Sequence, residues 1–317
     1  MRPKSPQSTN LEWQTDYFRS PVDQTKIRYA VYQSKTVEPK RFIVFLNGRT
    51  EWIEKYEQIP QWLDLPPGYA FLTWDHRGQG ASEGRQAHVD SYNHFAEDTA
   101  ALIEHVVGDR PYGIIAHSMG GLISLYTTLL GKISPAFLAL SSPLLMLPNT
   151  PVKRSISKPL SKVLTRSPLR FQHTGVSSML RQKFHGNSLT HSFQGFNLVV
   201  RSHYHNLSPT FGWVHASFEA IAFVNNPVHL KNLSCPTLII CGSQEKIVDY
   251  LGFPQWVMKA RQYADVSVDL IKIPAARHEI LNEIPRYRNQ AIKKMIAWAK
   301  ESHFFTVKAV QQESMSG

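Results

Sequence analysis

The chain has 317 residues, of which 42% are hydrophobic and 19% charged, and its formal net charge is +11. This length exceeds the needs of one small core and suits one large domain with an insertion. Because no hydrophobic run reaches the ~20 residues that a bilayer-spanning helix needs, the sequence predicts no membrane span.

The compartment is predicted from the first residues and from the cysteines. Met1–Gln7 is polar and lacks the apolar stretch of a secretory signal peptide, so we expect a cytoplasmic protein. Cys235 and Cys241 flank one predicted strand. Strand residues advance by about 3.3 Å each, which separates the two thiols by roughly 20 Å. That distance excludes a disulfide between them, and we expect both to be reduced.

Strand-like and helix-like runs alternate along much of the chain. Glu12–Arg19 and Thr25–Gln33 are typical of an antiparallel pair at a sheet edge. From residue 41 to residue 141 the alternation predicts a mostly parallel central sheet flanked by helices, which is an α/β fold. Pro285–Lys300 predicts a helix packed on the sheet, because four apolar residues recur at helical spacing: Ala291, Met295, Ile296 and Ala299.

A glycine-rich loop, Asp75–Ser82, follows the predicted strand Ala70–Trp74. A dinucleotide-binding loop would need a glycine fingerprint that opens a helix, and this segment has none. We therefore assign the loop no chemistry and expect it to support a neighbouring site.

The run 115–121 (Ile-Ala-His-Ser-Met-Gly-Gly) joins an apolar, strand-like stretch to a helix-compatible one. A serine on a sharp turn between a buried strand and a helix is typical of a nucleophile elbow. The tight turn requires small residues two positions before and after the serine, and these are Ala116 and Gly120. Glycine is usual at both positions, but alanine adds only a methyl group. We predict that Ser118 is a nucleophile; an ordinary glycine-rich turn is the alternative.

A serine nucleophile needs an imidazole to take its proton and an acid to orient that imidazole. On this kind of sheet the chain order is serine, acid, histidine. Downstream, the strand-like run Pro236–Cys241 is followed by Glu245, and the strand-like run Val266–Ile273 leads into a loop with His278. All three positions follow strand ends, where open α/β sheets bind ligands. We predict that Ser118, Glu245 and His278 form the catalytic triad.

Asp249 is the alternative acid. It lies four residues after Glu245, where we expect the next helix, near Phe253–Tyr263, to begin. Capping of that helix explains an aspartate at this position. We favour Glu245 because it comes first after the strand.

An oxyanion site is predicted from two backbone amides. In hydrolases with such an elbow, the residue after the nucleophile supplies one N–H group, and a loop after an earlier strand supplies the other. Here the predicted strand Arg41–Leu46 ends in Asn47–Glu51. The amides of Met119 and Arg49 are therefore the candidates.

At these motifs the chain resembles serine α/β-hydrolases of the monoacylglycerol lipase and lysophospholipase branch, most closely bacterial lysophospholipases of the PldB type. The likeness spans roughly residues 15–300, and an alanine before His117-Ser118 and a glutamate as the acid are typical of the lysophospholipase type. The runs that carry the likeness are Asn47–Glu51, Asp75–Gly80, Ala116–Gly121, Asn187–Thr190, Pro209–Trp213, Glu245–Asp249 and His278–Leu281.

The resemblance implies an α/β-hydrolase fold with an inserted helical cap. Between Ser141 and Pro236 the strand–helix alternation breaks, and a stretch of that length is not expected to be a structureless loop. We predict a first core part at residues 1–142, a cap at 143–230 and a second core part at 231–317.

The positive charge is concentrated in this middle region. No Asp or Glu occurs from Arg110 to Ser217, and the eleven Lys and Arg residues there equal the net charge of +11. Basic clusters attract anionic lipid headgroups, phosphates or nucleic acid.

Three of these cations, Lys158, Lys162 and Arg166, recur at every fourth residue. Apolar residues can line another face of the same short helix, which could lie on an anionic membrane. The alternative is a solvated basic face over an ordinary cap core. These apolar residues are Ile156, Leu160, Val163 and Leu164.

The predicted function is that of a serine carboxylic-ester hydrolase that cleaves a single-chain lipid, with a lysophospholipid favoured as substrate. A monoacylglycerol lipase or general carboxylesterase is the alternative, and a non-catalytic binder of anionic membranes or RNA is a further one. We expect no cofactor, no metal, no nucleic acid and no obligate protein partner, and we expect an anionic membrane surface as a peripheral partner. The cap histidines are too scattered to suggest a metal site: His173, His185, His191, His203, His205 and His215.

Overall fold

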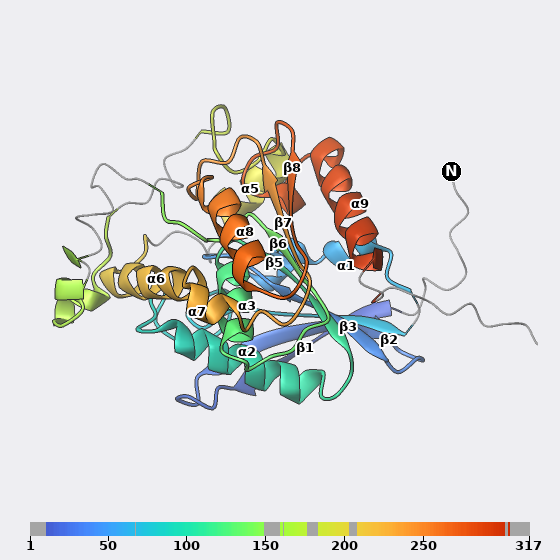
Figure 1. The fold of residues 1–317 in the computed structure, drawn as a ribbon. Coiled ribbons are helices and arrows are strands. Elements are labelled where there is room, and N and C mark those ends of the chain that lie inside the picture. Colours follow the sequence, from blue (N-terminus) through green and yellow to red (C-terminus); the bar gives the residue numbers. More distant parts are fainter. Residues whose placement is uncertain are drawn as a thin grey trace, which may run out of the picture.

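The computed structural model describes residues 11–66, 68–148, 159–160, 162–175, 183–202, 208–301 and 304. Within these ranges, eight strands form one sheet in the order β1-β2-β4-β3-β5-β6-β7-β8 (Figure 1). The strands are β1 (Leu11–Arg19), β2 (Lys26–Ser34), β3 (Arg41–Leu46), β4 (Tyr69–Trp74), β5 (Tyr112–His117), β6 (Leu138–Ser141), β7 (Thr237–Gly242) and β8 (Val268–Ile273).

The strand directions confirm the predicted sheet. From β4 through β3, β5, β6 and β7 to β8, every neighbouring pair is parallel. β2 runs antiparallel to both β1 and β4, and β1 lies at one edge of the sheet, as expected for the first two segments. The central strands are buried on both faces, which explains their continuous apolar runs.

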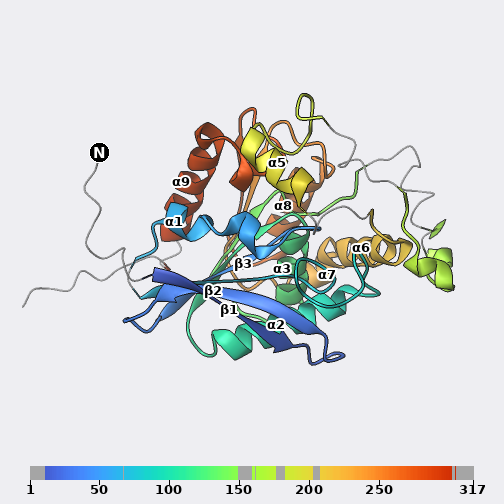
Figure 2. The ribbon, with the colours of Figure 1, turned by 180° about the vertical axis from the view of Figure 1, so that it is seen from behind.

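Helices cover both faces of the sheet. α1 and α9 pack on one face, and α2, α3 and α8 pack on the other (Figures 1 and 2). The predicted C-terminal helix is confirmed as α9, and the helices are η2 (Ile53–Tyr56), α1 (Ile59–Leu63), α2 (Tyr92–Val106), α3 (Met119–Leu129), η3 (Pro168–Phe171), α5 (Phe193–Arg201), α6 (Phe211–Val224), α7 (Pro227–Leu230), α8 (Gly252–Tyr263), η4 (Ile280–Asn282) and α9 (Pro285–Glu301).

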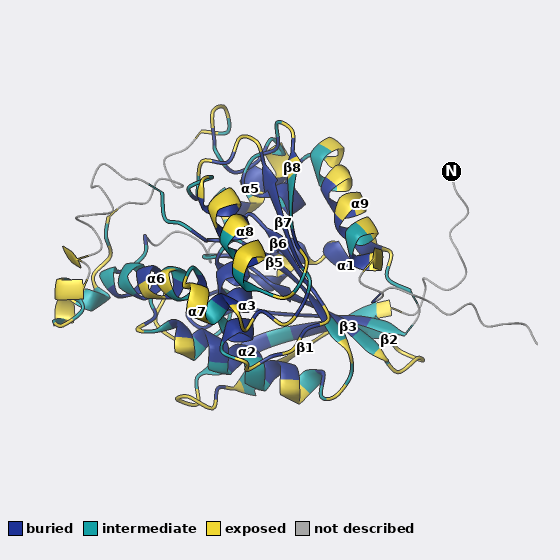
Figure 3. Ribbon diagram, in the orientation of Figure 1, coloured by how far each residue is buried: buried dark blue, intermediate teal, exposed yellow. Residues whose placement is uncertain are grey.

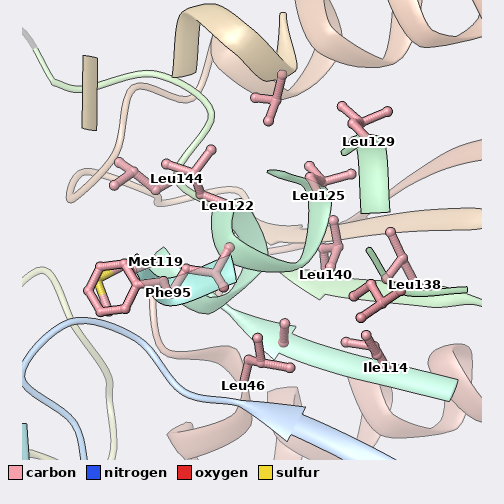
Figure 4. Close-up of a cluster of buried hydrophobic side chains, with 14 of the residues drawn as sticks. Leu46, Phe95, Ile114, Met119, Leu122, Leu125, Leu129, Leu138, Leu140 and Leu144 are labelled. Atoms are coloured by element: carbon pink, nitrogen blue, oxygen red, sulfur yellow. The ribbon is translucent and has the colours of Figure 1, made fainter. Parts of the chain in front are cut away.

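The core beneath α3 holds the elbow in place. Figure 4 shows Leu122 and Leu125 of α3 above Leu46, Ile114 and Leu140 from three adjacent strands. All five side chains are buried, and burial of one such side chain contributes about 1.5–3 kcal/mol. The burial colours in Figure 3 follow the same layers, with buried central strands and exposed outer faces on α8 and α9. The start of α3 is therefore fixed by strands on either side of β5.

The segment between β6 and β7 contains η3, α5, α6 and α7. α6 packs on α3, and its Trp213, Ala216 and Ala220 belong to the same core as Met119. The limits 143–230 for a cap remain a prediction. No helix in the described part of the chain is long and apolar enough to cross a membrane.

Candidate active site

The predicted elbow is present. β5 ends at His117, α3 begins at Met119, and Ser118 lies between them with φ 52° and ψ −115°. A positive φ at a residue other than glycine costs on the order of 1–3 kcal/mol unless its surroundings hold it. Here the Ser118 N–H donates to the Ser141 carbonyl (2.9 Å), and the Ser118 carbonyl accepts from the Leu144 N–H (2.9 Å). The strained conformation is therefore fixed by backbone bonds to the end of β6 and to the residues that follow it.

The need for small residues around the serine is confirmed. A Cβ atom on Gly120 would lie 2.3 Å from the Leu46 carbonyl oxygen, and one on Gly121 would lie 2.7 Å from Cβ of Pro143. Ala116 is fully buried in the sheet. The turn thus packs against β3 on one side and against the residues after β6 on the other.

Ser118, His278 and Glu245 form one chain of hydrogen bonds. The distance from His278 Nε2 to Ser118 Oγ is 3.1 Å, and that from His278 Nδ1 to Glu245 Oε2 is 2.7 Å. An ionised carboxylate only accepts, so Nδ1 carries the proton and Nε2 accepts from the hydroxyl. Ser118 is half-buried, whereas the other two residues are buried. The structure thus brings together the three residues predicted from the ends of β5, β7 and β8.

Glu245 is held in its ionised form. Its Oε1 accepts from the N–H groups of Ile247 (2.7 Å) and Val248 (3.2 Å). Burial by itself would raise the pKa of Glu245, but the charge and hydrogen bond of His278, with these two backbone donors, lower it below its usual value.

The pKa of His278 is shifted in the opposite direction. Burial by itself would lower its pKa, but the carboxylate of Glu245, with the charges of Glu279 and Glu51, raises the pKa above the ordinary 6.5. The imidazole is therefore poised to accept a proton, as a general base must.

Asp249 points elsewhere. Its Oδ1 accepts from the Leu251 N–H (3.1 Å), and its carbonyl accepts from the Gly252 N–H (2.9 Å). The expectation that Asp249 caps the next helix directly is wrong, because a further turn intervenes and Leu251 is the N-cap residue of α8. The carboxylate that faces Nδ1 of His278 is that of Glu245.

The loop after β3 is held by side chains on both sides of Arg49. The Gly48 N–H donates to Glu51 Oε2, and the Thr50 N–H donates to Gln79 Oε1. Gln79 belongs to the glycine-rich loop after β4, which therefore supports this loop, as expected. The loop conformation thus depends on a carboxylate within it and an amide outside it.

The same loop lies against the elbow. A Cβ atom on Gly48 would lie 3.2 Å from Cδ2 of His117, the last residue of β5. Met119 opens α3, and the first amides of a helix have no acceptor within it. Such a helix start favours a negative charge. The arrangement suits an oxyanion site; the amides of Arg49 and Met119 remain its predicted donors.

Sequence reasoning missed the contacts that hold the histidine loop. The buried carboxylate of Glu283 accepts from the N–H groups of Arg277 (3.0 Å) and His191 (2.9 Å), and the Glu279 N–H donates to the Leu189 carbonyl (2.9 Å). Segment 187–191 thus pairs with the loop on both sides of His278. The likeness of Asn187–Thr190 to the family's middle region was the one signal in the sequence. No spacing rule predicts that this segment contacts the loop around His278.

Both cysteines are free and buried. Within the described residues, no group of three or more His, Cys, Asp and Glu side chains is arranged to hold a metal ion.

A family profile described as "Serine aminopeptidase, S33" matches residues 37–285, which is most of the chain. The chain belongs to this S33 family. It is a serine hydrolase with the α/β-hydrolase fold.

Relatives of this S33 protein carry names from lipid metabolism. A probable lysophospholipase L2 from Haemophilus influenzae is 26% identical over 282 residues, which cover 85% of each chain. The monoglyceride lipase of Homo sapiens is 24% identical, over 85% of this chain and 86% of its own. These names confirm the resemblance to the lysophospholipase and monoacylglycerol lipase branch.

Solved structures show the same fold. A soluble variant of monoglyceride lipase from Saccharomyces cerevisiae, in complex with a substrate analog, superposes with a TM-score of 0.74. The match covers 95% of this chain and 98% of that one, at 21% sequence identity.

Proposed function

We propose that this protein hydrolyses the acyl ester of a single-chain lipid, with a lysophospholipid as the preferred substrate. The observation that carries the reaction type is the chain of hydrogen bonds from Ser118 through His278 to Glu245. It places a hydroxyl, a base and an orienting acid in the order that nucleophilic catalysis requires. The products are a fatty acid and a glycerophosphodiester.

The first half of the reaction forms an acyl-enzyme. Ser118 Oγ attacks the ester carbonyl while His278 Nε2, 3.1 Å away, takes the hydroxyl proton. Glu245 stabilises the imidazolium that results. The amides of Arg49 and Met119 bind the tetrahedral oxyanion. Loss of one such donor typically costs about 10²–10³ in rate.

The second half releases the acid. His278 returns its proton to the glycerol oxygen as the carbon–oxygen bond of the ester breaks. It then deprotonates a water molecule, which attacks the acyl group on Ser118. Collapse of the second tetrahedral intermediate frees the fatty acid and restores the serine hydroxyl. The sequence of steps needs no cofactor.

The substrate class rests on the relatives and on charge. The two relatives described above are named for lysophospholipids and monoglycerides. The nine cations of residues 143–230 suit an anionic headgroup. A monoacylglycerol lipase is the second candidate, because the yeast structure with this fold carries that name. The family description adds an aminopeptidase as a class to be tested.

A fluorophosphonate probe tests the enzyme assignment. We expect the probe to label the wild type at Ser118 and to leave the Ser118→Ala variant unlabelled. That variant should keep the circular dichroism spectrum of the wild type and lose ester hydrolysis. A folded Ser118→Ala protein that still turns over ester near the wild-type rate would show that Ser118 is not the nucleophile.

A substrate panel tests the class. We would compare lysophosphatidylcholine, lysophosphatidylglycerol, a monoacylglycerol of the same chain length and an aminoacyl p-nitroanilide. The highest kcat/KM should belong to a lysophospholipid. A monoacylglycerol hydrolysed faster than both phospholipids would favour the second candidate, and turnover of the anilide alone would assign a peptidase.

We further propose that the segment 159–170 docks on an anionic membrane, with the protein acting from the cytoplasm on the inner face. Lys162 and Arg166 are exposed, as predicted for the basic stripe, and Lys158 lies outside the described residues. Leu160 and Val163 keep 47% and 67% of their surface exposed, so the described structure does not bury them in a cap core. An exposed apolar and basic helix is the kind that binds at a lipid interface.

Vesicle co-sedimentation across a salt series tests the docking. Lys158, Lys162 and Arg166 would be replaced together by Gln, and Lys293, Lys294 and Lys300 on α9 would be replaced in a control of equal charge. Each nearby cation is worth about 1 kcal/mol at an anionic surface, less at high salt. The first variant should bind phosphatidylglycerol vesicles more weakly at low salt and hydrolyse a short soluble ester normally. An equal loss of vesicle binding in both variants would mean that binding depends on the net charge of the protein and not on this segment.

A further inference from the structure

A cluster of buried charges adjoins the proposed active site. Lys55, on η2, is about 1% exposed at its side chain, and its Nζ lies 2.6 Å from Glu51 Oε1 and 2.9 Å from Glu279 Oε1. The Tyr56 hydroxyl donates to Glu51 as well. We call Glu51, Lys55 and Glu279 the buried charge cluster. Its formal charge is −1, from two carboxylates and one ammonium group.

Each carboxylate of the cluster belongs to a different loop of the site. Glu51 lies on the loop after β3, and its Oε2 accepts from the Gly48 N–H, next to the predicted oxyanion amide of Arg49. Glu279 directly follows His278. Lys55 therefore bonds to both loops, as one side chain with two charged partners.

We propose that Lys55 is a positioning residue that ties the oxyanion loop to the histidine loop, and that the negative charge left on the buried charge cluster stabilises the protonated form of His278. This inference rests on the hydrolase mechanism given above. It gives Lys55 a function in the reaction that does not require contact between Lys55 and the serine.

Electrostatics supports the second half of the proposal. The groups that face His278 are Ser118 and Glu245, Glu279 and Glu51, and the ring of His117, whose centroid is 4.8 Å away. Burial, with the charges of His278 and Lys55, lowers the pKa of His117 to about 3, so His117 stays neutral. Among the described residues, the carboxylates of Glu245, Glu279 and Glu51 thus favour the protonated base, the ammonium of Lys55 offsets one of these charges, and the neighbouring imidazole of His117 is neutral.

Stability alone gives little reason for such a cluster. Desolvation of a buried ion costs several kcal/mol, and replacement of buried ion pairs by apolar residues is often neutral or stabilising. Removal of one member, in contrast, leaves an uncompensated charge. The cluster should therefore be tested with variants that separate charge from loop position.

Glu279→Gln tests whether the negative charge of the buried charge cluster stabilises protonated His278. The amide keeps an acceptor for Lys55 and removes one negative charge near His278. We expect the acid limb of kcat/KM to move to lower pH by about half a unit to one unit. Glu54→Gln is the control, because Glu54 is a carboxylate on the same 3-10 helix as Lys55 and forms its ion pair with Arg28, outside the buried charge cluster. Its acid limb should stay in place.

Lys55→Met and Lys55→Arg test whether Lys55 holds the two loops in place. In the methionine variant two carboxylates face each other without a cation, so we expect kcat to fall about 10–100-fold with KM within a factor of three. Arginine supplies a cation with several donors and should restore most of the activity. If Lys55→Met does not fold, Lys55→Arg and Glu279→Gln still carry the test.

Each outcome tests one part of the proposal. A Glu279→Gln acid limb that coincides with that of the wild type would overturn the electrostatic part. A folded Lys55→Met protein with wild-type kcat would overturn the positional part. Fluorophosphonate labelling of Ser118 in the wild type is measured alongside, so a failure of the hydrolase mechanism itself would be seen in the wild type and not in the variants.

Discussion

Glu245→Gln should be far more damaging than Asp249→Asn. In the glutamine variant the side-chain oxygen can still accept from the N–H groups of Ile247 and Val248, so the turn after β7 is kept. The amide NH₂ then faces His278 Nδ1, 2.7 Å from the present carboxylate oxygen, and favours the tautomer with the proton on Nε2. That tautomer cannot accept the serine proton.

The size of the loss follows from this geometry. Loss of the orienting acid in a triad typically costs about 10⁴ in kcat, which corresponds to about 5.5 kcal/mol of transition-state stabilisation. Asp249 makes its side-chain bond to the Leu251 N–H, and an asparagine oxygen can accept the same bond. We expect Asp249→Asn to stay within about threefold of the wild type.

Steady-state hydrolysis of a short p-nitrophenyl ester, with thermal unfolding of each variant, decides between the two acids. The soluble ester removes membrane binding from the comparison, and the melting temperature separates lost chemistry from lost fold. If the folded Asp249→Asn enzyme were the slower of the two, the assignment of Glu245 would be refuted. A Glu245→Gln enzyme within tenfold of the wild type would refute the tautomer argument.

Other expectations concern the base, the elbow and the thiols. Because its neighbours raise the pKa of His278 above 6.5 and the base must be neutral, kcat/KM should rise with pH and reach half its maximum above pH 6.5 in a pH–rate profile. Gly120→Ala should lower the free energy of unfolding by roughly 1–3 kcal/mol in a urea titration, with loss of activity, because its Cβ would meet the Leu46 carbonyl at 2.3 Å. Burial raises the pKa of Cys235 and Cys241 to about 12, so a disulfide reagent should label them only after denaturation.

The elbow and the sheet were predictable because their signals are local. An apolar run before Ser118, small residues on either side and a helix-compatible run after it specify a strand, a turn and a helix with little reference to the rest of the chain. The order of acid and histidine after two later strands is likewise visible in the sequence. Parallel strands then bring their carboxyl ends to one edge, and the distances follow.

The buried charge cluster was not predictable in this way. Glu51 and Lys55 are four residues apart, a spacing that is typical of an exposed pair on one helix face. Their burial depends on Glu279, which reaches them only when the loop after β8 packs beside the loop after β3. Sequence spacing holds no signal for that contact. For Leu160 the sequence left two alternatives, an apolar face on a membrane or one packed in a cap core, and spacing alone could not choose between them; the side chain is 47% exposed.

Several costs to stability lie at the edge of the sheet that holds the serine and the histidine, although residues elsewhere, such as Gln24, Asp64 and Ala87, also have a positive φ. Ser118 has a strained backbone, and Lys55 and two carboxylates are buried with their charges, all at or beneath the carboxyl ends of β3, β5 and β8. The strands that lead there are continuous apolar runs with ordinary geometry. Strain and buried charge persist in a fold only where the surroundings over-determine them, and a sequence selected for stability alone would remove both. At this edge a strained serine and a buried charge cluster occur next to the histidine, and that combination supports, apart from any motif, the placement of the function here.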